Sequence, residues 1–148
     1  MVRKLHLQIF ILIMLSGLIS SGFAAASDVL PKISCVLTDK VEGDAAVGEK
    51  SSFAKDTPML YLMCHSEEVE KGQTIKAVWI AVDTKNAAPA NYKIDEAGYK
   101  VEQDLGNSKV WNGKYSLSKP NNGWPLGSYK VDLYVNDQLS QSTKFAVK

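Results

Sequence analysis

Residues 58–64 read PMLYLMC and residues 75–83 read IKAVWIAVD, and these two apolar runs decide the fold. Each has the length of a β-strand, and most of its residues are apolar, with no alternation between apolar and polar positions. Alternate side chains of a strand point to opposite faces, so both faces of each run would be buried. The two runs therefore predict strands in the middle of a sheet.

Shorter segments with a period of two lie around these runs. Residues 129–135 alternate cleanly between inward side chains (Tyr129, Val131, Leu133 and Val135) and outward ones (Lys130 and Asp132). Residues 136–138 have the composition of a hairpin turn, and residues 143–148 would form the returning strand. Further strands are predicted at residues 32–38, 92–94, 99–105 and 110–117, the last three with the polar character of edge or outer strands.

No stretch shows a convincing helical period, and Gly, Pro, Asn and Asp separate the short segments. This pattern predicts an all-β fold, an antiparallel sandwich of about seven strands. Residues 39–56 are the exception, because only Val47 and Phe53 could anchor them in a core. They would form either a long loop or an irregular edge strand.

The first segment of the chain, residues 1–26, is predicted to be a secretory signal peptide. It has a basic start, an apolar run over residues 9–15 and the small residues 24–26 at its end. An N-terminal membrane anchor is the alternative, but Ser and Gly residues at 16–22 leave the run short of the ~20 apolar residues of a span. The expected mature chain is one domain, residues 27–148, secreted or periplasmic and not inserted in a membrane.

The two cysteines, Cys35 and Cys64, both lie in the mature chain. An even cysteine count in an exported domain favours a disulfide, and two cysteines allow one intramolecular pairing. Two free thiols, or thiols that bind a metal, are the alternative.

Three features resemble an immunoglobulin-like or fibronectin type III-like β-sandwich module of exported bacterial proteins. Cys64 in one strand is followed by Trp79 in the next, residues 125–129 (PLGSY) are similar to a tyrosine corner, and a hairpin at residues 136–138 precedes the last strand. The resemblance implies that Trp79 lies in the core and that the Tyr129 hydroxyl bonds back to the preceding turn. In antibody-type domains a cysteine would stand where this chain has Val131, so the resemblance is to the broader set of sandwich modules.

Composition and charge exclude several classes of protein. The 148 residues are 45% hydrophobic and 22% charged, which excludes a large multidomain enzyme and a disordered tail. The predicted leader carries Arg3 and Lys4, so the mature chain keeps 15 of the 17 basic residues and all 16 acidic ones, a formal net charge of −1. A nearly neutral domain is not expected to bind nucleic acid.

The sequence also lacks a recognisable catalytic set. His65 is the one histidine of the predicted mature chain, and a disulfide-bonded Cys64 could not act as a nucleophile. The carboxylates, among them Glu67, Glu68 and Glu102, lie among lysines in polar connections, as on a solvated surface. We therefore expect a non-enzymatic protein without a cofactor, an interaction module whose loops or edge strand contact an envelope or surface protein.

Two alternative functions have candidate residues. Trp111 and Trp124 lie beside turn residues, where they could form a surface for a protein partner or stack on a carbohydrate; otherwise they cover the ends of the core. Met59, Met63 and His65 share one face of a predicted strand, and thioether and imidazole ligands suit copper, as in a periplasmic copper carrier. Core packing of the methionines is the ordinary interpretation.

Overall fold

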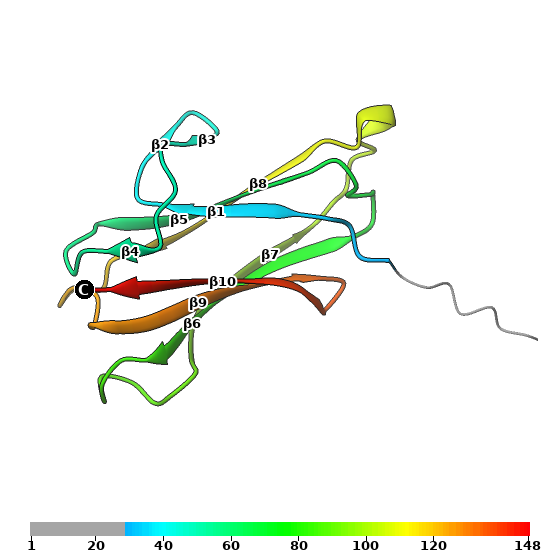
Figure 1. Cartoon of the computed structure of the whole chain (residues 1–148). Helices are drawn as coiled ribbons and strands as arrows, with labels where there is room; N and C mark the ends of the chain where they lie inside the picture. Colours follow the sequence, from blue (N-terminus) through cyan, green and yellow to red (C-terminus); the bar gives the residue numbers. More distant parts are fainter. Residues whose placement is uncertain (1–28) are drawn as a thin grey trace, which may run out of the picture.

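Two β-sheets face each other and enclose one hydrophobic core (Figure 1). This computed structural model describes residues 29–148, so the predicted signal peptide lies outside the described residues. The strands are β1 (Ser34–Thr38), β2 (Val41–Glu42), β3 (Ala45–Ala46), β4 (Ser52–Phe53), β5 (Met59–Ser66), β6 (Thr74–Asp83), β7 (Tyr92–Lys100), β8 (Trp111–Ser118), β9 (Gly127–Val135) and β10 (Gln138–Val147).

The strand order confirms the predicted antiparallel, immunoglobulin-like sandwich. One sheet has the order β1-β5-β8 and the other has the order β4-β10-β9-β6-β7. There are ten strands rather than about seven, because residues 39–56 contribute three strands of two residues each. Two of these form a small hairpin, and β4 pairs in parallel with the edge of β10. Both predicted interior strands, β5 and β6, have a neighbour on each side.

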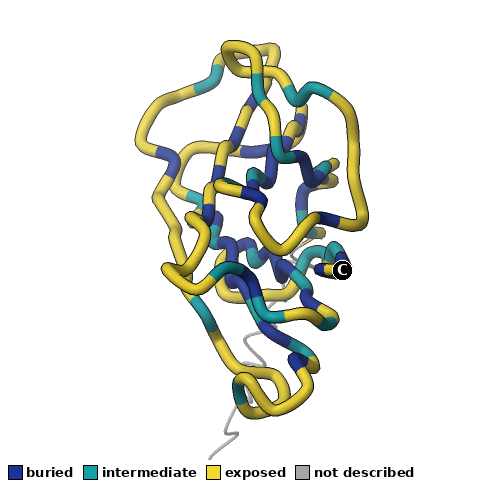
Figure 2. Tube along the Cα trace, turned by 90° about the vertical axis from the view of Figure 1, so that its left-hand side faces the viewer, coloured by how far each residue is buried: buried dark blue, intermediate teal, exposed yellow. Residues whose placement is uncertain are grey.

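The pleat of the strands places every second side chain in the core. Along β8 buried and exposed residues alternate without exception, and buried residues gather between the two sheets (Figure 2). Trp79 is 1% exposed, as predicted, and its ring meets the ring of Phe145 edge to face at 6.2 Å between centroids. Phe53 of β4 also meets the Phe145 ring edge to face, at 5.7 Å between centroids, which fastens the short strand to the core.

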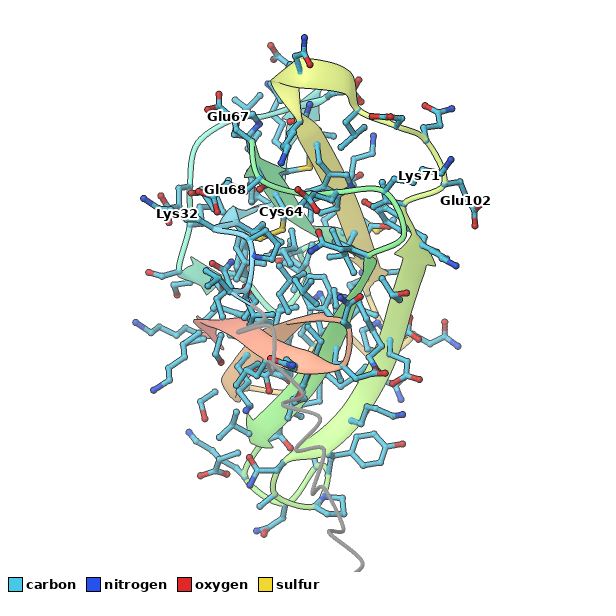
Figure 3. All side chains as sticks on the ribbon, turned by 90° about the vertical axis from the view of Figure 1, so that its right-hand side faces the viewer. Lys32, Cys64, Glu67, Glu68, Lys71 and Glu102 are labelled. Atoms are coloured by element: carbon cyan, nitrogen blue, oxygen red, sulfur yellow. A yellow bond between two sulfur atoms is a disulfide. The ribbon has the colours of Figure 1, made fainter. Side chains whose placement is uncertain are left out.

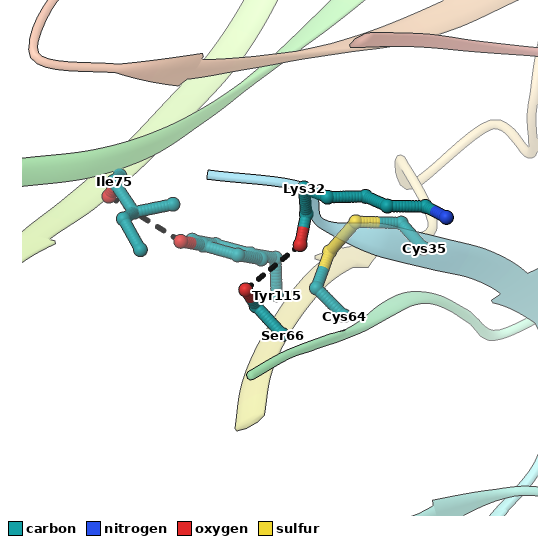
Figure 4. Close-up of a disulfide and its surroundings, with 6 residues drawn as sticks. All are labelled: Lys32, Cys35, Cys64, Ser66, Ile75 and Tyr115. Carbon is teal, nitrogen blue, oxygen red and sulfur yellow. Dashed lines mark hydrogen bonds between the residues drawn. A yellow bond between two sulfur atoms is a disulfide. The ribbon is translucent and has the colours of Figure 1, made fainter. Parts of the chain in front are cut away.

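The disulfide predicted from the cysteine count is confirmed, and it joins two neighbouring strands of one sheet. Cys35 of β1 and Cys64 of β5 are direct partners in the antiparallel register, with Cα atoms 4.1 Å apart. The disulfide lies near the beginning of β1 and the end of β5, where Ser66 Oγ also donates to Lys32 O at 2.8 Å (Figure 4). Two independent links therefore hold the beginning of β1 against β5.

The strand predicted as two pieces, residues 92–94 and 99–105, is instead the single strand β7, and residues 101–105 lie outside it. The charged Asp95 and Glu96 obscure the strand in the sequence because they interrupt its apolar alternation. They are tolerated because β7 is an edge strand, where both side-chain faces and one backbone edge reach solvent. None of the described residues forms a helix long and apolar enough to cross a membrane.

The tyrosine corner is present as the resemblance implied. The Tyr129 hydroxyl donates to the carbonyl oxygen of Pro125 at 2.6 Å, and the Trp124 ring meets the Tyr129 ring edge to face. Burial raises the pKa of Tyr129, so its hydroxyl stays protonated and remains a donor. This hydrogen bond ties the loop before β9 to the beginning of that strand.

Replacing Tyr129 by phenylalanine should lower the free energy of unfolding by about 1–2 kcal/mol, because the ring stays in place while the Pro125 carbonyl loses its donor. Urea denaturation of the two proteins measures this difference. Tyr61→Phe, at a half-buried tyrosine on the other sheet, is the matched control and should change stability by less than about 0.5 kcal/mol. Equal losses in both variants would contradict a specific role for the corner.

Candidate interaction surfaces

The two tryptophans considered as a binding surface are buried, so of the two alternatives the structure shows the one in which they cover the ends of the core. Trp124 is 1% exposed, and its Nε1 donates to the carbonyl oxygen of Thr57 at 2.8 Å. Trp111 is 5% exposed, and its ring lies against Gly113, where an added Cβ would stand 2.4 Å from the ring. A small sandwich needs large side chains to close its ends, and these two rings serve that purpose. Neither can stack on a carbohydrate without leaving the core.

The residues proposed as copper ligands share the outer face of β5, but they do not converge. Met59 and Met63 are four residues apart on an extended strand, roughly 13 Å, which is too far for both to bind one ion. Met63 and His65 do line one cleft of about 380 Å³ between the β2–β3 hairpin and the three-stranded sheet. His65 Nδ1 lies 2.9 Å from Asn112 Oδ1. Among residues 29–148 no group of three or more His, Cys, Asp and Glu side chains could hold a metal ion.

The carboxylates near the disulfide end of the sandwich lie on its surface. Figure 3 shows Glu67, Glu68 and Glu102 at separate places around this end, with their side chains directed outward. Glu68 accepts a hydrogen bond from the backbone N–H of Lys32 at 2.7 Å. This arrangement does not place two carboxyl groups on opposite sides of a substrate cleft, as acid–base hydrolysis requires.

An aromatic stack closes the gap between the edge strands β7 and β8. Tyr99 of β7 stacks on Tyr115 of β8 at 5.9 Å between ring centroids and contacts the Trp111 ring at 6.0 Å. Burial raises the pKa of both tyrosines, and Tyr115 donates to the carbonyl oxygen of Ile75 at 3.3 Å (Figure 4). Both hydroxyls therefore stay protonated at neutral pH. The stack joins the two sheets and offers no general base.

The backbone edge of β7 is free. Within the described residues β7 pairs with β6 on one side and with no strand on the other, and eight of its nine residues are exposed. The N–H of Val101 donates to the carbonyl oxygen of Gln73 at 2.8 Å, which fixes the direction of the backbone where the strand ends. Backbone groups of successive residues in an antiparallel strand point to opposite sides. The N–H and C=O groups of Glu96, Gly98 and Lys100 therefore point away from β6, into solvent.

An apolar pocket of about 150 Å³ lies beside the first residues of β7. Tyr92 and Ile94 of β7 form one wall, and Trp124, Tyr129 and neighbouring prolines form the others. The Trp124 N–H and the Tyr129 hydroxyl already donate to backbone carbonyls within the protein. The pocket therefore accepts an apolar group, of about the size of a benzene ring.

Comparison with known proteins gives no family for this chain. No family model matches the chain, and no curated protein matches it. Among solved structures, an immunoglobulin-like protein from Pseudomonas aeruginosa is 11% identical with a TM-score of 0.45, over 79% of this chain and 92% of that one.

Two larger proteins resemble the chain over part of their length. An alkylpurine DNA glycosylase from Pseudomonas fluorescens is 10% identical with a TM-score of 0.49, over 80% of this chain and 31% of its own. A β-glucosidase from Erythrobacter marinus is 11% identical with a TM-score of 0.42, over 80% of this chain and 16% of its own. At these identities and TM-scores the likeness carries no argument about what this chain does.

The sequence predicts edge or outer strands at residues 92–94 and 99–105, and the edge position of β7 confirms this. The sequence pattern splits this strand into two fragments, however, and the aromatic residues considered for binding were Trp111 and Trp124. The exposed aromatics include Tyr92 and Tyr99, both on β7, which are 52% and 40% exposed. Tyr92 and Tyr99 lie on either side of the charged Asp95 and Glu96, and these two tyrosines were the signal in the sequence for one continuous strand.

Proposed function

We propose that this chain is an exported, non-enzymatic interaction module that binds an extended segment of an envelope or surface protein along β7. The observation that carries the proposal is the free edge of this nine-residue strand, with outward donors and acceptors at three alternate residues. An extended peptide can add to such an edge as a further strand, with main-chain hydrogen bonds supplying affinity.

The pocket beside β7 supports the same mode of binding. In strand addition, pockets for alternate side chains supply specificity. A segment that pairs with β7 would run past the apolar pocket lined by Tyr92 and Ile94 and could place one apolar side chain in it. We therefore expect a partner segment with a Leu, Ile or Phe flanked by residues of high strand propensity.

The charges on β7 agree with a selective partner. Long exposed edges invite unspecific pairing, and charged side chains are a common protection. Lys93 and Glu96 form an ion pair at 3.0 Å on this strand, and Asp95 and Lys100 are exposed. A strand with a complementary charge order can pair here, whereas a purely apolar strand would leave these groups poorly solvated.

Export is part of the proposal. The predicted leader at residues 1–26 and the Cys35–Cys64 disulfide both fit a secreted or periplasmic protein, because disulfides persist in oxidising compartments. Mass spectrometry of the protein from its native host tests it. A mature chain that begins near Ser27 and carries the intact disulfide is expected, and an uncleaved chain in the cytoplasm would contradict export.

Lys100→Pro tests binding along the edge. Proline removes the outward N–H at this position and its ring obstructs an added strand, while no bond to β6 is lost. With the purified mature chain as bait for crosslinking in an envelope extract, capture of the partner should fall by about tenfold or more. Lys100→Ala is the matched control, because it removes the charge and keeps the N–H, and it should capture the partner as the unmodified chain does.

Amide hydrogen exchange gives an independent measurement. In the free protein Glu96, Gly98 and Lys100 should exchange faster than Ala97 and Tyr99, and the captured partner should slow the first group. A partner that binds without protecting these amides, or that binds the proline variant equally well, would show that another surface is used.

A further inference from the structure

The outer face of the five-stranded sheet is apolar at its centre, although no other strand or helix of the described residues packs on it. Thr74 and Lys76 come first on the outward face of β6, and three apolar side chains follow them, Val78, Ile80 and Val82. Val78 is 8% exposed, and the other two are half-buried. The solvent face of an antiparallel sheet ordinarily carries polar residues at such positions. The three side chains are therefore suited to a face that another protein covers.

Charged side chains surround this apolar stripe in two parallel rows across the strands. The register across β7, β6, β9 and β10 gives an acidic row, Glu96, Val78, Asp132 and Ser142. The next row on the same face, two residues along β6, β9 and β10, is basic and contains Lys93, Ile80, Lys130 and Lys144. Each row thus has an apolar residue at the same place, with charge of one sign on both sides of it.

Within one copy of the chain these rows neutralise each other only in part. Lys93 lies 3.0 Å from Glu96, and Lys130 lies 2.7 Å from Asp132, whose other carboxylate oxygen accepts from Ser142 Oγ. The basic row extends further, to the exposed Lys144. The two rows therefore give the centre of the face one acidic and one basic side. Lys76 lies on the same face beyond the acidic row, where it pairs with Asp137 at 3.1 Å.

We infer that this face binds a second copy of the chain, face to face, about a two-fold axis that runs across the strands between the two rows. This rotation reverses the strand direction and places each acidic row on the basic row of the other copy. Glu96 then lies opposite the partner's Lys93, Asp132 opposite the partner's Lys130, and Val78 against the partner's Ile80. An apolar centre with a charged rim is the usual composition of a protein interface.

Other face-to-face arrangements bring like charges together. A two-fold axis along β6 would place Glu96 on the partner's Asp132 and Lys93 on the partner's Lys130. An axis between β6 and β9 would place Val78 on the partner's Asp132 and Lys93 on the partner's Lys144. Like charges across an interface disfavour association, so the charge pattern selects the axis across the strands. This inference concerns a sheet face and does not depend on the proposed use of the β7 edge.

Charge reversal at one corner of the face tests the arrangement. Lys93 and Glu96 have 59% and 47% exposed side chains, so their replacement should leave the fold intact. Lys93→Glu would set two acidic groups against each other, and Glu96→Lys two basic ones. Because every contact of a two-fold interface occurs twice, each single variant should weaken dimerisation by about tenfold or more in sedimentation equilibrium of the mature chain.

Two further samples separate this pairing from a general charge effect. An equimolar mixture of the Lys93→Glu and Glu96→Lys variants should form heterodimers as stable as the original dimer, because both corners then carry opposite charges. The double variant K93E/E96K should dimerise as the original chain does. Lys114→Glu, on the other sheet, changes net charge equally and should have no effect.

A chain that stays monomeric up to millimolar concentration would overturn the inference. So would single variants that dimerise normally, or a mixture that associates no better than either variant alone. Circular dichroism of each variant confirms that the sandwich is folded in every comparison.

Discussion

Gly127→Ala is expected to lower the free energy of unfolding of the domain by several kcal/mol. A Cβ at position 127 would stand 2.1 Å from the carbonyl oxygen of Asp83 and 2.9 Å from the Cα of Thr84. Both are backbone atoms, so no side-chain rotation can relieve the contact. Gly127 also has φ +155°, a conformation that residues with a Cβ rarely adopt.

The close approach follows from the way β6 and β9 end. Their register shifts between Ala81 and Asp83, and the irregularity presses the backbone of Asp83 against the first residue of β9. To admit a methyl group the two central strands of the larger sheet would have to separate. Backbone strain and overpacking each cost about 1–3 kcal/mol, so we expect a loss of roughly 3–5 kcal/mol in the free energy of unfolding.

Urea denaturation followed by tryptophan fluorescence measures this loss. Gly43→Ala is the matched control, since Gly43 has φ +60° but nothing within 4 Å of an added Cβ. It should cost about 1 kcal/mol, the backbone preference alone. If Gly127→Ala lowered the free energy of unfolding no more than this control, the close contact with Asp83 would have no effect on stability.

The features predicted correctly from the sequence rest on local pattern or on simple chemistry. The apolar runs at β5 and β6 indicate interior strands wherever they pair, and Tyr129 lies four residues after the carbonyl that it binds. The disulfide required only an even cysteine count and an oxidising compartment. None of these depends on which distant strands become neighbours.

The features that the sequence left open concern residues whose role depends on their neighbours in space. Trp111 is buried because Gly113, two residues along the same strand, leaves room for its ring, and because Tyr99 of another strand covers it. Asp132 was predicted to point outward, and it does, yet it is buried by Lys130 and Ser142. The methionines share a face with His65, but strand geometry sets them too far apart for one ion.

The charged rows that carry the dimer proposal could not be predicted for the same reason. The acidic and basic rows combine residues of four strands, and only the register places Lys93 beside Ile80 and Lys130. The edge position of residues 92–94 and 99–105 follows from their polar character, but their union into one strand of nine residues does not. A sequence with one charged residue more or less in these strands would have the same predicted fold and a different face.

Reducing the Cys35–Cys64 bond should lower the free energy of unfolding by roughly 3–4 kcal/mol, since the bond closes a loop between residues 29 positions apart in the chain. With an m-value of about 1.5–2 kcal/mol/M, the urea midpoint would fall by about 2 M. Dithiothreitol is preferable to substitution, because both sulfur atoms stay in the core and no cavity adds to the loss. A Cys35→Ala/Cys64→Ala variant, unfolded with and without the reductant, controls for effects of the reductant itself.

The structure also predicts where the reduced protein opens first. β1 is a five-residue edge strand that pairs only with β5 among the described residues. Once the bond is broken, the hydrogen bonds to β5 and the Ser66–Lys32 contact remain to hold it. The amides of β1 should therefore exchange faster on reduction. The amides of β6 and β9 should exchange only through global unfolding, at a rate set by the free energy of unfolding. If the reduced and oxidised proteins had the same urea midpoint and the same exchange at β1, pairing with β5 alone would hold this strand, and the bond would have no role in stability.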